Sequence, residues 1–172
     1  MYDLDGGTTW GANAVDFENE SYVGTGIIYN DELATPTGGP VPEWDTYQGD
    51  QGLYFVASGA NGTTIPNDDW MISPEFSLSG ITSPIFSMKA KSVNDTYGLE
   101  RFQIAVGTST DYNDFTVISD GAYIEAPTDW TTYEFDLSEY EDQNIRIAIH
   151  YVGNDSFVLQ TDSFKVEGTL GI

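Results

Sequence analysis

Large apolar side chains occupy every second position of the segment Ile145-Arg146-Ile147-Ala148-Ile149-His150-Tyr151. A period of two places successive side chains on opposite faces of an extended strand. The isoleucine positions therefore predict a face buried in a core, and Arg146 and His150 predict a polar face. No stretch of the chain shows a helical period of similar quality.

The same alternation recurs along the chain, with turn residues between the segments. Further strands are expected at residues 15–17, 52–57, 69–72, 84–91, 101–106, 115–118, 132–137, 156–161 and 163–166. Turns are expected at residues 94–98, 111–114 and 153–155, which are rich in Asn, Asp and Gly. This number and spacing of strands predicts an all-β fold, an antiparallel two-sheet β-sandwich of the jelly-roll kind.

The core of this sandwich is predicted from the apolar positions of the strands. We expect these side chains to be buried between the two sheets: Phe17, Trp70, Ile72, Phe76, Phe86, Met88, Phe102, Ile104, Val106, Phe135, Leu137, Ile147 and Phe164.

Length and composition indicate one globular domain over residues 1–172. Hydrophobic residues make up 40% of the 172 residues and aromatic residues 14%, which is too apolar for a disordered chain. The absence of cysteine excludes disulfides, thiolate metal sites and a cysteine nucleophile. No apolar run approaches the ~20 residues that span a bilayer, so no membrane insertion is expected.

The charge balance restricts the partners. There are 28 acidic and five basic residues, for a net charge of −23, so nucleic acid and anionic lipid surfaces are unsuitable partners. The acids form a solvating surface, or some of them bind hard cations. The acidity, the polar loops and the aromatic residues suggest a monomeric module of a longer bacterial protein, secreted or at the cell surface.

One segment carries a family resemblance: Asp69-Trp70-Met71-Ile72-Ser73-Pro74-Glu75-Phe76-Ser77-Leu78. It resembles the D-W-L-I-S-P-x-F-x-L signature of the cleaved-adhesin and choice-of-anchor J families, jelly-roll domains of exported bacterial proteins that include gingipain adhesin domains and are MAM-like in shape. Other elements follow in the family's order, among them residues 16–19, 86–91, 100–110, 130–137, 145–150 and 159–166. The resemblance spans about residues 15–168, but residues 24–49 match no part of the pattern.

The resemblance implies a jelly roll, calcium in many members, and association with adhesion, glycan capture or neighbouring domains of a larger protein. For calcium, the paired terminal strands of such modules suggest Glu18 and Asp162 as ligands, with Asp16 as an alternative. Simple alternation leaves the side of Asp162 ambiguous, and a bulge would have to reconcile it with Phe164. Solvated acids remain the other interpretation. Asp111, Asn113 and Asp114 form a second oxygen-rich segment, for which a plain turn is the favoured interpretation.

The basic residues suggest a ligand-binding face. Lys89, Lys91, Arg101, Arg146 and His150 occupy polar positions of strands, and a hairpin turn at residues 94–98 would bring the first three together. Such a face would bind an acidic or sulfated polysaccharide, since Arg forks match carboxylate and sulfate oxygens. Tyr97, Tyr123 and Trp44 join it as stacking residues. The competing interpretation is cross-strand pairing of the cations with Glu100, Glu134 and Asp136.

Trp44 and Tyr47 lie beside the irregular segment from Ser21 to Gly49, which contains three prolines. They either pack this segment onto the sandwich or face a ligand. The lone histidine, His150, has no triad partners, and there is no phosphate loop or zinc spacing, so we expect no enzyme activity. The sequence thus predicts a non-catalytic, calcium-stabilised, carbohydrate-binding module. The alternatives are an adhesin spacer without a glycan ligand and, more remotely, a polysaccharide-active enzyme.

Overall fold

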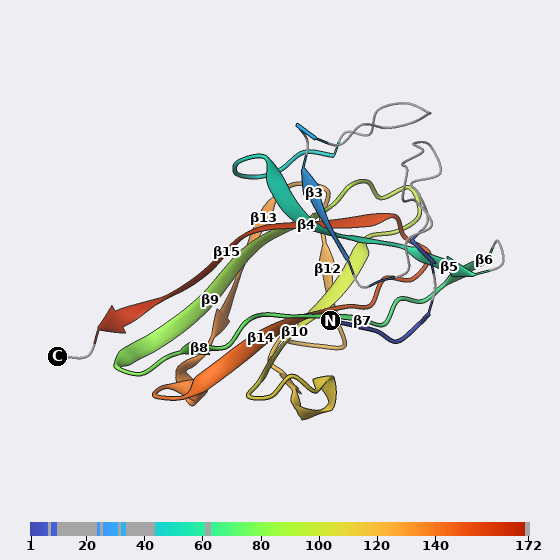
Figure 1. Ribbon diagram of the computed structural model, residues 1–172. Coiled ribbons are helices and arrows are strands. Elements are labelled where there is room, and N and C mark those ends of the chain that lie inside the picture. Colours follow the sequence, from blue (N-terminus) through green and yellow to red (C-terminus); the bar gives the residue numbers. More distant parts are fainter. Residues whose placement is uncertain are drawn as a thin grey trace.

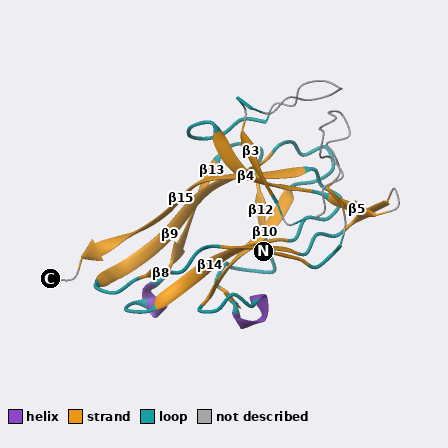
Figure 2. Cartoon of the chain, in the orientation of Figure 1, coloured by secondary structure: helices purple, strands orange, loops and turns teal. Residues whose placement is uncertain are grey.

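Two antiparallel β-sheets pack face to face in the computed structural model of the chain (Figures 1 and 2). The structure describes residues 1–6, 8–9, 24, 26–30, 32–33, 44–60 and 63–170. Within these residues the all-β, jelly-roll-type sandwich predicted from the sequence is confirmed. No helix of the described residues is long and apolar enough to cross a membrane.

The first sheet has seven strands and follows the order β1-β7-β14-β10-β11, with β12 paired to β10 and β8 paired to β14. Its strands are β1 (Tyr2–Asp3), β7 (Asp69–Ile72), β8 (Phe76–Ser77), β10 (Glu100–Gly107), β11 (Thr116–Val117), β12 (Ile124–Ala126) and β14 (Asn144–Tyr151). The alternating segment at residues 145–151 thus lies in a central strand, β14, with β7 and β10 on its two sides.

The second sheet has five strands in the order β13-β9-β15-β4-β3. Its strands are β3 (Ile27–Asn30), β4 (Gln51–Val56), β9 (Ile81–Ser92), β13 (Thr131–Asp136) and β15 (Val158–Leu170). Figure 1 shows the long strands β9 and β15 running side by side toward the end at which the C-terminus lies. A small third sheet joins β2 (Thr8–Thr9), β5 (Ser58–Ala60) and β6 (Thr63–Ile65), and two short 3-10 turns cover Tyr112–Asp114 and Ser138–Tyr140.

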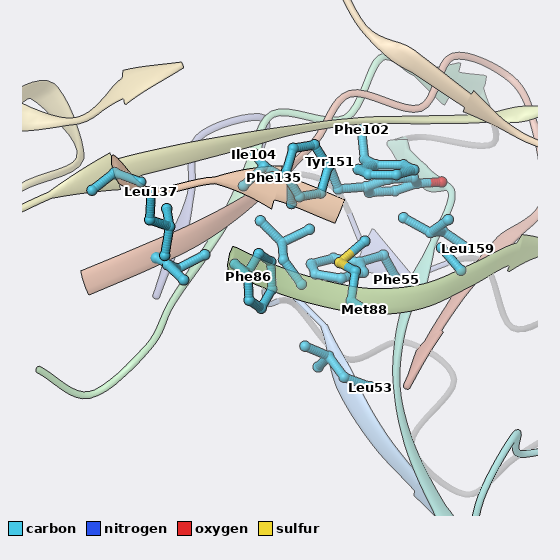
Figure 3. Packing of buried hydrophobic residues seen from close by; sticks show 14 of the residues in the cluster. Leu53, Phe55, Phe86, Met88, Phe102, Ile104, Phe135, Leu137, Tyr151 and Leu159 are labelled. Carbon is cyan, nitrogen blue, oxygen red and sulfur yellow. The ribbon is translucent and has the colours of Figure 1, made fainter. Parts of the chain in front are cut away.

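The core between the two large sheets consists of the apolar positions of their strands. Figure 3 shows Phe86, Met88 and Phe55 packed close to Phe102 and Tyr151. Eight predicted core residues are confirmed in this cluster: Phe86, Met88, Phe102, Ile104, Val106, Phe135, Leu137 and Ile147. Phe76 is half-buried against the same cluster, and Phe17 lies outside the described residues.

Trp70 and Ile72 are covered, but not between the sheets. They lie on the outer face of the seven-stranded sheet, where Trp70 packs with Ala105 and Ala148 beneath Tyr112. Only 8% of Trp70 is exposed, so the predicted burial is right and the predicted location is wrong. The reason is parity, since Met71 between them is the residue of β7 that reaches the main core.

Phe164 is a second correction, because 47% of its surface is exposed. The two segments predicted at residues 156–161 and 163–166 form one strand, β15, whose register with β9 shifts between Asp162 and Lys165. Ser163 has a positive φ of 54° at this bulge. The extra residue reverses the alternation, so Thr161 before the bulge and Val166 after it both point inward, whereas Asp162 points outward with Lys89.

The connection at residues 93–99 is not a hairpin within one sheet. β9 pairs with β13 and β15, whereas β10 pairs with β14, β12 and β11, so the chain changes sheets here. Glu100, the first residue of β10, points inward with Phe102 and is fully buried. It therefore does not pair with the surface cations, as the competing interpretation of the basic residues assumed.

Three donors surround the Glu100 carboxylate. Tyr151 Oη donates at 2.6 Å and Ser156 Oγ at 2.7 Å, and the backbone N–H of Phe157 also donates to it. Burial raises the pKa of Glu100, and the three donors oppose that rise. Because Tyr151 ends β14 and Phe157 precedes β15, this carboxylate fastens the two sheets to each other where the chain crosses between them.

We expect Glu100→Gln to lower the free energy of unfolding by about 1–3 kcal/mol. The amide NH2 of glutamine would face at least one of the three groups that donate hydrogen bonds to the carboxylate, and two donors cannot pair. Chemical denaturation of both proteins measures the difference. Glu125→Gln, which changes an exposed side chain of β12, is the matched control and should change stability by less than about 0.5 kcal/mol. Equal losses from the two substitutions would contradict a special role for Glu100.

Candidate functional site

The outer face of the five-stranded sheet carries the first candidate site. Phe86, Met88 and Ala90 of β9 point into the core, so Lys89 and Lys91 between them point outward. Thr132 of β13 lies directly opposite Lys89 and accepts a hydrogen bond from its Nζ at 2.6 Å. Strand alternation alone therefore places two cations side by side on this face.

A loop covers the neighbouring part of the same face. Trp44, 6% exposed, packs with Tyr29 and Tyr54, which lie on the outer side of β3 and β4. Tyr54 Oη and Gln160 Nε2 donate to the carbonyl oxygen of Asp45 at 2.6 and 3.2 Å. The loop is thus fixed to the sheet through both its apolar side chain and its backbone.

Asp162 of β15 holds the next turn of this loop. Its Oδ2 accepts the backbone N–H groups of Tyr47 at 2.8 Å and Gln48 at 3.0 Å, and its Oδ1 accepts the N–H of Ser163. The bulge that exposes Phe164 therefore leaves Asp162 on the outer face, where it positions Tyr47.

Tyr47 and Trp130 form an aromatic pair beside the two lysines. Their ring centroids are 5.9 Å apart in an edge-to-face arrangement, and 47% of Tyr47 is exposed. Lys89 Nζ lies 4.4 Å from the centroid of Tyr47, and Lys91 Nζ lies 5.3 Å from that of Trp130. We call Tyr47, Trp130, Lys89, Lys91 and Asp45 the aromatic–lysine patch.

Asp45 fixes the orientation of this patch. One carboxylate oxygen pairs with Lys91 Nζ, and the other accepts a hydrogen bond from Trp130 Nε1 at 3.0 Å. Burial alone would raise the pKa of Asp45, but the hydrogen bonds from Lys91 and Trp130 hold that pKa below its usual range. The carboxylate thus stays ionised and keeps the indole edge in place beside the exposed ring of Tyr47.

The predicted single face of five basic side chains is wrong. Lys89 and Lys91 lie on the five-stranded sheet, whereas Arg101, Arg146 and His150 lie on the outer face of the seven-stranded sheet. The error follows from the connection at residues 93–99, which changes sheets instead of forming a hairpin. The individual residues keep their predicted outward direction.

On the seven-stranded sheet the cations serve local contacts. Arg101 pairs with Glu125 at 3.2 Å and lies 4.5 Å over the ring of Tyr123, which is 41% exposed. Arg146 Nη1 donates to the carbonyl of Ser73 at 3.0 Å. Tyr97, 62% exposed, lies in the connection between the sheets. The buried Trp44 is not available for stacking, which confirms the packing interpretation for that residue.

His150 is not a cation of a ligand face. Its ring stacks on Trp70 with centroids 4.0 Å apart, and its Nε2 and Nδ1 lie 2.8 and 2.7 Å from Asp68 Oδ1 and Gln103 Oε1. Burial lowers the pKa of His150, and the neighbouring Asp68 offsets only part of that shift. The ring of this histidine is thus held against Trp70 by two hydrogen-bonding partners.

A second candidate site joins β1 to β7. Asp3, Asp5 and Asp69, the aspartate triad, each offer a carboxylate oxygen, and these oxygens lie within 4.8 Å of one another. Asp3 and Asp69 are direct cross-strand partners, although like charges in that position repel. Asp69 is 2% exposed, and its Oδ1 has no hydrogen-bond partner among the described residues. A cation between these strands would satisfy both features.

The triad was not predicted as a metal site. The sequence contains a signal for it: Asp3 and Asp5 are two residues apart and are followed by Gly6, and Asp69 is the first residue of the signature segment. Of the predicted calcium ligands, Glu18 and Asp16 lie outside the described residues. Asp162 is described, and its oxygens face the backbone N–H groups of the loop. Asp111 caps the short turn at Tyr112–Asp114 by accepting the N–H of Asn113.

Comparison with known proteins gives matches among solved structures. The chain matches no protein-family model and no curated protein sequence. It is similar to the K1 cleaved adhesin domain of Lys-gingipain from Porphyromonas gingivalis W83, with a TM-score of 0.58 and 16% identity over 85% of this chain and 99% of that chain. The K3 domain of the same protein gives a TM-score of 0.58 and 14% identity over 89% and 95% of the two chains.

A carbohydrate-binding module is also among the matches. TmCBM61, solved in complex with beta-1,4-galactotriose, gives a TM-score of 0.52 and 12% identity over 94% of this chain and 99% of that chain. At such identities the likeness concerns the fold. The resemblance seen in the signature segment is thus confirmed at the level of structure: the chain has the β-sandwich fold of the cleaved adhesin domains of Lys-gingipain.

Proposed function

We propose that this domain is a non-catalytic, extracellular carbohydrate-binding module whose ligand lies on the aromatic–lysine patch. The observation that carries the proposal is the Tyr47–Trp130 pair, in which Tyr47 is exposed and Trp130 is half-buried, held in place by Asp45 and Asp162. Aromatic faces stack on the apolar faces of sugar rings, and nearby fixed polar groups give such sites their orientation. The similarity in fold to a galactotriose-bound module supports this function.

The five basic side chains from which an acidic ligand was predicted do not all lie at this site. An acidic or sulfated polysaccharide was predicted from five basic side chains on one face, and only Lys89 and Lys91 lie at this site. The alternative is an adhesin-type spacer that binds a neighbouring domain or protein, and the fold similarity to gingipain adhesin domains is compatible with it. Binding to a polysaccharide through the patch separates the two functions.

We propose in addition that the domain binds a structural calcium ion at the aspartate triad. Calcium prefers hard oxygen ligands at 2.3–2.6 Å, so oxygens on opposite sides of one ion are about 5 Å apart, which fits the spacing within the triad. The buried, unpartnered Oδ1 of Asp69 supplies a ligand that has no other role among the described residues. The ion would fasten β1 to β7 and so keep Tyr2 near Trp70.

Tyr47→Ala and Trp130→Ala should each weaken polysaccharide binding about tenfold or more, because each removes one stacking face. Affinity electrophoresis against plant, algal and mucin polysaccharides, including β-1,4-galactan and xylan, measures the change. Tyr123→Ala is the matched control, since Tyr123 is similarly exposed beside a cation on the other sheet. Loss of binding in Tyr123→Ala alone would move the site to the seven-stranded sheet, and no binding by the unaltered domain would favour the spacer.

Calcium at a hundredfold excess over its dissociation constant should stabilise the domain by about 2.7 kcal/mol and raise its melting temperature by about 5–10 °C over the value in chelator. Asp3→Asn should lose this response. In chelator the same variant should melt at or above the unaltered protein, because it removes repulsion between Asp3 and Asp69. Differential scanning calorimetry measures both effects.

Two further variants locate the ion. Asp114→Asn, in the exposed turn that follows Asp111, should keep the full calcium response. Glu18→Gln tests the ligand predicted from the sequence: if it abolishes the response while Asp3→Asn does not, calcium binds near Glu18 and not at the triad.

The metal-free domain should lose stability as the pH rises from about 4 to about 8. Burial, together with the carboxylates of Asp5 and Asp3, raises the pKa of Asp69 to about 8 from 3.8. The folded state therefore holds a proton that the unfolded state has released, which favours folding at low pH by up to about 1.4 kcal/mol per pH unit in this window. In chelator, the melting temperatures at pH 5 and pH 8 should differ less for Asp69→Asn than for the unaltered protein. An equal pH dependence of the melting temperature in the two proteins would show that Asp69 does not cause it.

A further inference from the structure

Lys89 differs from the other basic side chains in what surrounds it. Lys91, Arg101 and Lys165 form ion pairs with Asp45, Glu125 and Glu167. Lys89 forms none with any carboxylate of the described residues, although the chain has 28 acidic residues and only five basic ones. Arg146 also has no such pair, but its guanidinium donates to the Ser73 carbonyl on the other sheet.

The carboxylate best placed to pair with Lys89 is engaged elsewhere. Asp162 lies directly across from Lys89 in the register of β15 with β9. Its two oxygens instead accept backbone N–H groups of Tyr47, Gln48 and Ser163. The loop that positions Tyr47 thus takes the acceptor that would otherwise neutralise the lysine.

The ammonium group of Lys89 therefore keeps unused donors. It has three N–H donors, and among the described residues Thr132 Oγ1 supplies its one hydrogen-bond acceptor, at 2.6 Å. The Tyr47 ring lies 4.4 Å away, and the side chain is half-buried. A half-buried cation without a counter-ion is poorly solvated, and an anion that reaches it gains a charge-assisted hydrogen bond.

We infer that the polysaccharide bound at the aromatic–lysine patch carries an anionic group, a carboxylate or a sulfate ester, and that Lys89 binds this group directly. The inference rests on the proposed function and specifies its ligand class. Tyr47 and Trp130 would stack on the sugar rings, and Lys89, beside Tyr47, would take the charged substituent.

The net charge of −23 does not prevent this recognition. Charges separated by more than about 8 Å are largely screened at physiological ionic strength, so the distant acids act weakly on a ligand at the patch. The contact between Lys89 and an anion is shorter than that distance and is screened much less. The acidic residues repel anionic polymers from most of the surface, whereas Lys89 attracts an anionic group at the patch.

Two matched pairs of polymers test the inference by isothermal titration calorimetry. One pair is polygalacturonate and its full methyl ester, and the other is a sulfated galactan and the same galactan after desulfation. In at least one pair the anionic polymer should bind about tenfold or more tightly than its neutral match. The pair that shows the preference identifies carboxylate or sulfate as the recognised group.

Lys89→Met should abolish the preference by lowering the affinity for the anionic polymer to about that for the neutral polymer, whereas Lys89→Arg should keep the preference. Lys165→Met, which removes an exposed lysine already paired with Glu167, is the control and should also keep it. A preference that persists in Lys89→Met, or neutral polymers that bind the unaltered domain as tightly as anionic ones, would overturn the inference while leaving carbohydrate binding intact. Failure of Tyr47→Ala to weaken any binding would instead refute the site itself.

Discussion

The Glu100 carboxylate lies where the chain passes from the five-stranded sheet to the seven-stranded sheet, and the arrangement of the rest depends on that crossing. Tyr151, Ser156 and the backbone of Phe157 all donate to it, so one buried acid joins β10, the end of β14 and the approach to β15. Ser92 extends this junction, since its Oγ accepts the N–H of Glu100 and donates to the Ala126 carbonyl. Because β9 and β10 belong to different sheets that share one core, their polar sides face in opposite directions.

This separation gives each outer face its own chemistry. On the seven-stranded sheet, Trp70 is enclosed by His150 and Tyr112, so the part of this face around β7 is covered by the protein itself. On the five-stranded sheet, the loop at residues 44–50 covers the part over β4 and β15 with Trp44 and leaves Tyr47 exposed at its end. The proposed ligand site therefore lies at the border between the covered and the open parts of one sheet.

Much of the fold could be predicted from the alternation of apolar and polar residues, because a strand with one buried face has an apolar side chain at every second position. Phe86, Met88, Phe102 and Ile104 were assigned correctly on that basis. Phe164 was not, since a bulge shifts the parity without a signal in side-chain type. Trp70 was expected between the sheets because it is large and apolar, but alternation does not reveal that an outer face can also be covered.

The residues of the two candidate sites were harder to predict, because these sites depend on which segments meet in space. The lysines of β9 were singled out correctly as outward-facing, but Tyr47 and Trp130 join them from segments far apart in sequence. The aspartate triad likewise combines the first residues of the chain with β7. Whether sugar binds on the five-stranded sheet can be read from the indole N–H signals of ¹⁵N-labelled protein during titration with an oligosaccharide that the domain binds. The Trp130 signal should shift and the Trp70 signal should stay in place; a shift of Trp70 with an unchanged Trp130 would instead place the ligand on the seven-stranded sheet.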